Sequence, residues 1–154
     1  RRQVGSSDMT TIATDGYTIA ADTRQVGRFI DKVQAKKIHK IRGNLVGCAG
    51  SVSSIALFIK WFGDDRADES LRPELEAESI EALVVTPDGQ AVVYEWQLVP
   101  FEVGLPHACG TGSMAAMGAM LAGASPVQAI AIAAELDPST GGDVWAINKE
   151  GSDE

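Results

Sequence analysis

Histidine and cysteine are scarce in this chain, and long apolar runs are absent from its sequence. His39 and His107 are the only histidines among 154 residues, and neither has a spacing typical of metal ligands. Cys48 and Cys109 each lie in an apolar run, which predicts two buried free thiols in preference to a disulfide. No apolar run approaches the roughly 20 residues that a membrane-spanning helix needs. We therefore expect no metal, no cofactor and no membrane partner.

Basic charge is also scarce. Against 21 acidic residues the chain has 13 lysines and arginines, for a formal net charge of −8. Nucleic-acid affinity comes from neutralised phosphates, so this balance argues against a nucleic-acid partner. The hydrophobic fraction of 45% is ordinary for a globular domain, and no secretory pattern opens the chain. We expect one cytoplasmic domain over residues 10–148, with a flexible extension at 1–9 (a propeptide or tag) and a polar tail at 149–154.

The rest of the chain is organised around a predicted hairpin that begins at residue 10. Short β-type runs flank Asp15-Gly16, a dipeptide suited to a two-residue turn because it tolerates positive φ. This hairpin is expected to bring Asp22 back beside Thr10. A Thr-Thr pair at the start of a strand usually reflects β-propensity alone. A threonine with a free α-amine, however, has a nucleophile and a base on one residue.

Turn signals and apolar periodicity predict the other elements. Ser51 is a good N-cap ahead of apolar residues spaced i, i+3, i+4 and i+7, and Ser125-Pro126 starts another helix. The helices are expected at 52–63, 114–121 and 127–135, and the strands at 35–41, 45–50, 82–86, 90–95, 97–103 and 144–147. The strand hairpins predict antiparallel sheets, and the helices must cover the outer faces of these sheets. This arrangement is an α+β fold, a four-layer αββα sandwich with two mainly antiparallel sheets. The acidic stretch between the first helix and the next strand is interpreted as a solvated linker, in preference to a docking surface.

Several strings, in a fixed order, resemble a known family. They are TTIATDG, AADTR, AKKIHKI and GNLVGCAGS, followed by the loops at 110–113 and 137–142. The chain resembles proteasome β-subunits and the related bacterial heat-shock-locus peptidase over essentially residues 10–148, and it looks like a bacterial or phage member. The resemblance implies the N-terminal nucleophile hydrolase fold and a threonine-type peptidase.

The resemblance also implies a role for each matching side chain. Thr10 matches the N-terminal nucleophile, whose hydroxyl oxygen attacks the peptide carbonyl. Lys37 matches the lysine beside that hydroxyl, whose ammonium lowers the hydroxyl and amine pKa values. Asp22 matches the carboxylate that keeps this lysine charged and oriented. A free α-amine has a pKa of about 7.7–8.0, so it is suited to act as the base while the lysine stays a fixed charge.

Backbone and loop positions complete the implied site. Gly47 matches the residue whose N–H binds the developing oxyanion, and its lack of a side chain lets the substrate approach. Thr111, Asp137 and Thr140 match the residues that hold the amine of the nucleophile and the catalytic water. Serine is common in the family where the two threonines stand, and the hydroxyl is kept.

Substrate contacts follow from the same resemblance. A peptide is expected to lie extended and to pair its backbone with the segments around Arg24 to Val26 and Gly47 to Ala49. Ala35, Leu45 and Ala49 match the first specificity pocket of the family. That pocket is then apolar and uncharged, which predicts cleavage after hydrophobic residues.

Together these roles predict a threonine endopeptidase subunit of a self-compartmentalising ring protease. The resemblance implies polypeptide substrates, a homo-oligomeric double ring of six- or seven-fold symmetry, and an ATP-dependent unfoldase as partner. A catalytically silent ring with a structural or binding role stays open, as does a small-molecule amidohydrolase, although Lys37 counts against the latter. The decisive bond joins Met9 to Thr10, because Thr10 has no free amine while this bond is intact.

Overall fold

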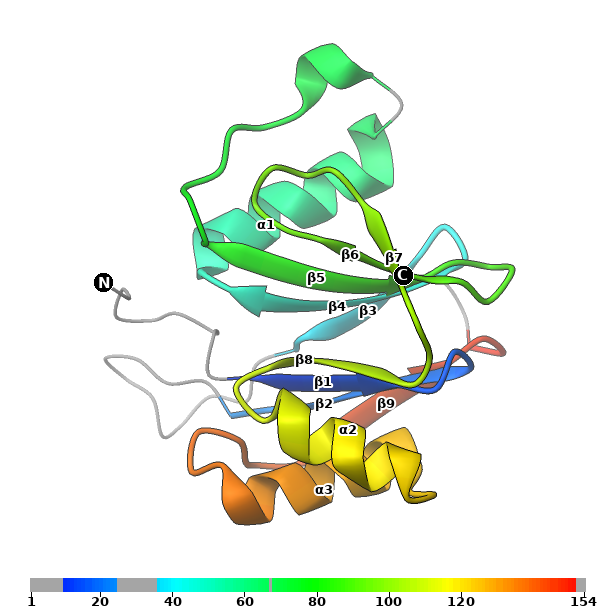
Figure 1. Ribbon diagram of the computed structural model, residues 1–154. Coiled ribbons are helices and arrows are strands. Elements are labelled where there is room, and N and C mark those ends of the chain that lie inside the picture. The colour runs from blue at the N-terminus through cyan, green and yellow to red at the C-terminus, as the bar shows by residue number, and fades with distance from the viewer. Residues whose placement is uncertain (1–9, 25–35, 67, 152–154) are drawn as a thin grey trace.

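The computed structural model describes residues 10–24, 36–66 and 68–151 and has four layers (Figure 1). The smaller sheet has the order β8-β1-β2-β9, and the larger sheet has the order β3-β4-β5-β6-β7. The strands are β1 (Thr11–Thr14), β2 (Thr18–Asp22), β3 (Ile38–Ile41), β4 (Asn44–Gly50), β5 (Ile80–Val85), β6 (Ala91–Tyr94), β7 (Phe101–Val103), β8 (His107–Gly110) and β9 (Val144–Asn148). All strand pairs are antiparallel. The predicted αββα sandwich of two antiparallel sheets is therefore confirmed.

Helices cover the outer face of each sheet. Helix α1 (Val52–Lys60) packs on the larger sheet, while α2 (Ser113–Leu121) and α3 (Pro126–Leu136) cover the smaller one (Figure 1). The predicted caps are confirmed: the side chain of Ser51 accepts the Ser54 N–H, and Ser125 forms a capping box with Gln128. A π-helical turn, Trp61–Asp65, extends α1. In the described segments no helix is long and apolar enough to cross a membrane.

The hairpin of β1 and β2 is wider than expected. Three residues, Asp15 to Tyr17, separate the strands, so the predicted two-residue turn is wrong. The carboxylate of Asp15 accepts the N–H groups of Tyr17 and Thr18, each at 2.9 Å, and this local bonding stabilises the longer loop. The register pairs Ile12 with Ala21. Asp22 therefore lies opposite Thr11, one residue further along β1 than predicted.

The side chains of the central strands alternate between two apolar layers. Ile12 belongs to the cluster between the sheets, whereas Ala13 belongs to the cluster beneath α2 and α3. A third cluster, which includes Phe58 and Tyr94, fills the space between α1 and the larger sheet. Because successive strand residues point to opposite faces, Thr10 belongs on the face of Ile12 and Thr11 on the face of Ala13. Thr10 and Thr11 therefore face different layers of the sandwich.

Two predicted elements have different bounds in the structure. The strand expected at 97–103 is reduced to β7, and the acidic stretch includes a short 3₁₀-helix, Glu69–Leu71. Most of the acidic stretch is exposed, but its last carboxylate, Glu81, lies half-buried in β5. The strand expected from residue 35 is described from Ile38 onward.

Candidate active site

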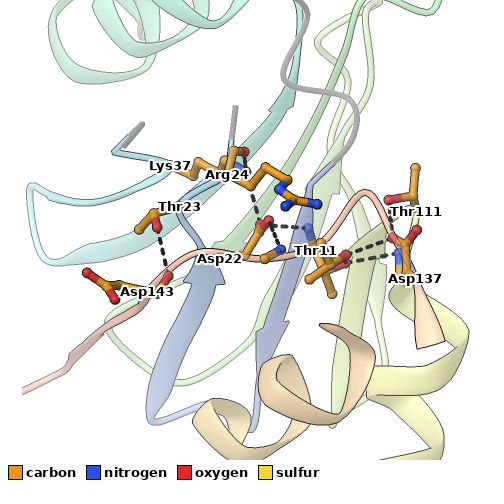
Figure 2. Close-up of polar contacts among 11 residues, drawn as sticks. Thr11, Asp22, Thr23, Arg24, Lys37, Thr111, Asp137 and Asp143 are labelled. Atoms are coloured by element: carbon orange, nitrogen blue, oxygen red, sulfur yellow. Dashed lines mark hydrogen bonds and ion pairs between the residues drawn. The ribbon is translucent and has the colours of Figure 1, made fainter. Parts of the chain in front are cut away.

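A buried ion pair lies where the two sheets meet near the start of β1 (Figure 2). Lys37 Nζ is 3.0 Å from Asp22 Oδ1, and the two side chains are 2% and 0% exposed. The same carboxylate accepts the N–H of Thr11 and the N–H of Gly141, each at 3.1 Å. Asp22 thus joins β1, the segment before β3 and the loop before β9. The carboxylate is fully hydrogen-bonded, as a buried charge requires.

The surroundings of Lys37 act on its charge in opposite directions. Burial lowers the pKa of Lys37, the carboxylate of Asp22 partly opposes this effect, and the charge of Arg24 lowers the pKa further. The ammonium also donates to the carbonyl oxygen of Arg24. Lys37 is therefore oriented by two acceptors while its ionised form is less favoured than in water.

A second polar cluster surrounds the carboxylate of Asp137. Thr111 and Thr140 donate their hydroxyls to Asp137 Oδ2 at 2.6 and 2.7 Å, and the Ser139 N–H donates to Oδ1 at 3.1 Å. Burial works against ionisation, but these hydrogen bonds outweigh it and lower the pKa of Asp137. The structure therefore brings together the three loop residues that the sequence predicted.

Thr11 links the two clusters, a role that its sequence motif did not indicate. Its hydroxyl lies 2.7 Å from Thr140 Oγ1 and accepts the Gly112 N–H at 3.0 Å. The carbonyl of Thr10 accepts the Thr111 N–H at 2.9 Å. Both threonines are buried. Alternation along β1, combined with strand pairing, was the signal that would have placed Thr11 toward these loops and Thr10 toward the second sheet.

Arg24 forms two hydrogen bonds to the loop that contains Asp137. Its backbone N–H donates to the Gly141 carbonyl at 3.0 Å, and its guanidinium donates to the Pro138 carbonyl. One residue earlier, the Thr23 hydroxyl donates to the Asp143 carbonyl at 2.9 Å. The end of β2 therefore fixes the position of this loop relative to Asp22.

Gly47 lies opposite Ile38, the residue after Lys37, but its backbone does not have the direction expected of an oxyanion donor. An added Cβ at Gly47 would lie 2.6 Å from Ile12 Cγ2 and 3.0 Å from Ile19 Cδ1, between the two sheets. The neighbouring Cys48 N–H donates to the Lys37 carbonyl, so the Gly47 N–H points the other way, toward β5. Gly47 therefore fits the packing of the two sheets and not a substrate carbonyl.

Gly50 ends β4, three residues after Gly47. Its φ is +138°, and an added Cβ would lie 2.1 Å from the Ser79 carbonyl oxygen, so only glycine fits. It lies two residues after Cys48, and its N–H points to the same side of β4 as that of Cys48. It also borders a cavity with Gly110 and Thr111.

Replacing Gly47 by alanine is expected to destabilise the fold without altering the chemistry. The added methyl group would overpack the core against Ile12 and Ile19, at a cost of about 1–3 kcal/mol in the free energy of unfolding. Urea unfolding measures this loss, and kcat of the folded fraction should stay unchanged. An unaltered unfolding free energy together with a large fall in kcat would contradict this packing role and show that the reaction needs the space at Gly47.

The predicted substrate residues have different positions in the structure. Leu45 is fully buried in the cluster between the sheets and does not border the cavity, so its expected place in a specificity pocket is not supported. Ala49 does border the cavity, whose volume is about 470 Å³. Val26 and Ala35 lie outside the described residues.

Both cysteines are free and buried, as predicted from their apolar neighbours. Burial raises the pKa of Cys48 to about 12 and that of Cys109 well above its ordinary value. Neither thiol is therefore suited to act as a nucleophile near neutral pH. Within the described part of the chain, no group of three or more His, Cys, Asp or Glu side chains is placed to hold a metal ion.

Comparisons with known proteins give structural matches alone. No protein-family model and no curated protein sequence matches the chain. Thiobacillus denitrificans BPH matches with a TM-score of 0.64 and 20% identity, over 90% of this chain and 95% of that one. Its complex with Epoxomicin matches with a TM-score of 0.63 and 19% identity, over 90% and 96%. Eukaryotic HslV from Trypanosoma brucei matches with a TM-score of 0.63 and 21% identity, over 90% and 97%.

The chain has the HslV fold. It is the N-terminal nucleophile hydrolase fold, which the sequence motifs predicted, and the resemblance to the proteasome and heat-shock-locus peptidase family is confirmed at the level of the fold. At identities of 19–21% the HslV fold alone does not assign an activity.

Proposed function

We propose that the chain is a threonine peptidase whose nucleophile is the hydroxyl of Thr10 once residue 10 is the N-terminus. The observation that supports this most is the buried ion pair of Lys37 and Asp22, whose carboxylate also holds the Thr11 N–H. This geometry anchors the residue next to Thr10 to the carboxylate that pairs with the buried cation. On the other side, the Thr111 N–H donates to the carbonyl of Thr10, and the Thr111 hydroxyl donates to Asp137.

The α-amine of Thr10 and the ammonium of Lys37 have different roles in the proposed reaction. The free α-amine of Thr10 removes the hydroxyl proton, the hydroxyl oxygen attacks the peptide carbonyl, and the amine then gives the proton to the leaving nitrogen. The ammonium of Lys37 stabilises the negative charge that develops on the hydroxyl. Water then attacks the ester, and the free carboxylate of the product and the Thr10 hydroxyl are released. Thr111, Asp137 and Thr140 orient the α-amine and this water.

Polypeptides are the proposed substrates. An extended peptide would pair its backbone with the segment after Arg24, including Val26, and with the end of β4 at Ala49. Ala35 and Ala49 are the proposed apolar side chains of the first specificity pocket, so cleavage after hydrophobic residues is the proposed preference. No cofactor takes part in the proposed reaction.

A homo-oligomeric assembly is part of the proposal. Met114, Leu121 and Leu136 on α2 and α3 are 85%, 71% and 72% exposed, which favours contacts with further copies of the chain. A double ring of six- or seven-fold symmetry in the cytoplasm, fed by an ATP-dependent unfoldase, is the proposed form. Light scattering coupled to size-exclusion chromatography measures the mass of the assembly.

The state of the bond between Met9 and Thr10 tests the proposed function. Protein released with Thr10 as its first residue is expected to cleave fluorogenic apolar peptides, and protein that retains residues 1–9 is expected to be inactive. Intact mass and N-terminal sequencing establish which form is assayed. Equal activity of the two forms would contradict an N-terminal nucleophile, and inactivity of both would favour the silent ring.

Epoxomicin, which is bound in one of the matching structures of Thiobacillus denitrificans BPH, supplies a second probe. We expect the form that begins at Thr10 to bind Epoxomicin and the form that retains residues 1–9 to bind it much more weakly. Thermal shift and intact mass measure this difference. Binding that is equal in both forms would show that the compound does not report on the free amine.

A further inference from the structure

The hydroxyl of Thr11 connects strand β1 to two loops of the candidate site. Its oxygen accepts the Gly112 N–H at 3.0 Å and lies 2.7 Å from Thr140 Oγ1. An added Cβ at Gly112 would lie 2.3 Å from Thr11 Oγ1 and 3.1 Å from Thr140 Oγ1, so the three residues are closely packed. The Thr11 side chain therefore contacts both the start of α2 and the loop after α3.

The peptide group between Thr10 and Thr11 is held at both of its polar atoms. The N–H of this group donates to Asp22 Oδ1 at 3.1 Å. Its carbonyl oxygen accepts the Thr111 N–H at 2.9 Å. These two hydrogen bonds fix the backbone beside the proposed nucleophile, and with it the place from which the Thr11 side chain extends.

The direction of the hydrogen bond between Thr11 and Thr140 follows from a count of protons. A threonine hydroxyl has one proton and two lone pairs. Thr140 donates its proton to Asp137 Oδ2 at 2.7 Å. Although burial works against ionisation, hydrogen bonds lower the pKa of Asp137, so this carboxyl is ionised near neutral pH and has no proton to give back. Thr11 is therefore the donor to Thr140.

We propose that Thr11 is a positioning residue that keeps the hydroxyl of Thr140 directed at Asp137. This inference rests on the proposed peptidase function, in which Thr140 helps to orient the α-amine of Thr10. With its proton given to Asp137 and one lone pair taken by Thr11, the Thr140 hydroxyl can only accept a further hydrogen bond. An amine that donates an N–H to this oxygen keeps its own lone pair for the proton of the nucleophile, as a base must.

Without the hydroxyl of Thr11, the direction of the Thr140 hydroxyl is no longer fixed. Its proton could turn from Asp137 to the α-amine, where it would occupy the lone pair that the base needs. The N–H of Gly112 would also lose its acceptor in a buried place. The expected effect is on the chemical step, so kcat should fall while KM stays the same.

The test uses Thr11→Val, which removes the hydroxyl and keeps a β-branched side chain, in protein that begins at Thr10. Loss of one hydrogen bond predicts a fall in kcat of about tenfold, with KM unchanged. Thr11→Ser keeps the hydroxyl and should keep kcat near the wild-type value. Thr11→Ala replaces the valine variant if that variant does not fold.

Thr14→Val is the matched control. Thr14 lies at the other end of β1 and is as buried as Thr11. Its hydroxyl also makes one donated and one accepted hydrogen bond, to the Thr18 carbonyl at 2.7 Å and from the Gly16 N–H at 3.0 Å. The folded control should therefore keep the wild-type kcat. An equal fall in kcat would show that loss of any buried hydroxyl from β1 is sufficient, and it would overturn the role of Thr11.

Amide hydrogen exchange separates this inference from the proposed function. The Gly112 N–H donates to Thr11, and the Thr140 N–H donates to the Asp137 carbonyl at 3.0 Å. Both should exchange faster in Thr11→Val and at the wild-type rate in Thr11→Ser and Thr14→Val. If the wild type cleaves no peptide, the peptidase proposal fails, while faster exchange still supports the hold of Thr11 on the loop.

The result that overturns the inference depends on whether the wild type is active. In an active enzyme, wild-type kcat in a folded Thr11→Val variant would overturn the role of Thr11. In an inactive protein, wild-type exchange at Gly112 and Thr140 in that variant would do so. Circular dichroism checks that each variant is folded.

Discussion

Replacing Thr10 by alanine is expected to abolish peptide cleavage while leaving the fold intact. The variant keeps the α-amine and the backbone carbonyl that accepts the Thr111 N–H, but it lacks the attacking oxygen. Removal of a nucleophile from a catalytic unit costs a thousandfold or more in kcat, and on the order of 10⁶ in a well-studied hydrolase. Initial rates on a fluorogenic apolar peptide measure the loss, in protein shown by sequencing to begin at residue 10.

Two matched variants make this result specific to Thr10. Thr10→Ser keeps a hydroxyl in the same place and should retain measurable activity. Thr11→Ser keeps the hydroxyl that bonds Thr140 and Gly112, so it should retain activity as well. Thermal unfolding and assembly mass should match the wild type in all three variants. Cleavage at the wild-type rate by Thr10→Ala would refute the assignment.

Replacing Asp22 by asparagine should have the largest effect on stability. The ammonium of Lys37 would then lie buried without its counter-ion. The amide nitrogen of the asparagine, itself a donor, would also face at least one group that donates to Asp22 in the wild type: Lys37, the Thr11 N–H or the Gly141 N–H. Breaking a buried pair in this way costs about 3–5 kcal/mol in the free energy of unfolding. Urea unfolding followed by circular dichroism measures the loss, and a change below about 1 kcal/mol would contradict the burial of the pair.

The double variant Asp22→Asn with Lys37→Met separates structure from chemistry. Removing both charges leaves no unpaired buried ion, so much of the lost stability should return. Activity should not return, because the fixed charge beside Thr10 is gone, and kcat is expected to stay about 10²–10³-fold below wild type. Recovery of activity along with stability would show that the pair is structural only.

The sequence was most informative where a feature depends on neighbours along the chain. The serine caps Ser51 and Ser125 are set by residues within one turn of their helices. The residues Asp22, Lys37 and Asp137 could be named because their motifs surround them in the sequence. The turn after Thr14 was predicted too short, because the Asp15 carboxylate bonds backbone two and three residues away.

Positions that depend on which side of a strand faces the site could not be read from the sequence. Gly47 and Gly50 lie in the same string, and only strand pairing shows that the first packs against Ile12 while the second borders the cavity. Leu45 was assigned to a pocket although it faces the core. Thr11 was missed because its partners lie on distant strands and loops. Residues one or three positions apart on a strand point to opposite faces of the sheet, and a sequence motif does not show which face lies toward the site.

The sequence by itself therefore determined the fold class, the helix caps and the residue types of the candidate site. Each of these follows from local spacing, composition or motif. Only the tertiary structure decided which glycine borders the cavity and why Thr11 and Thr10 have separate partners. The physical reason is that packing two sheets face to face joins residues that no local pattern relates.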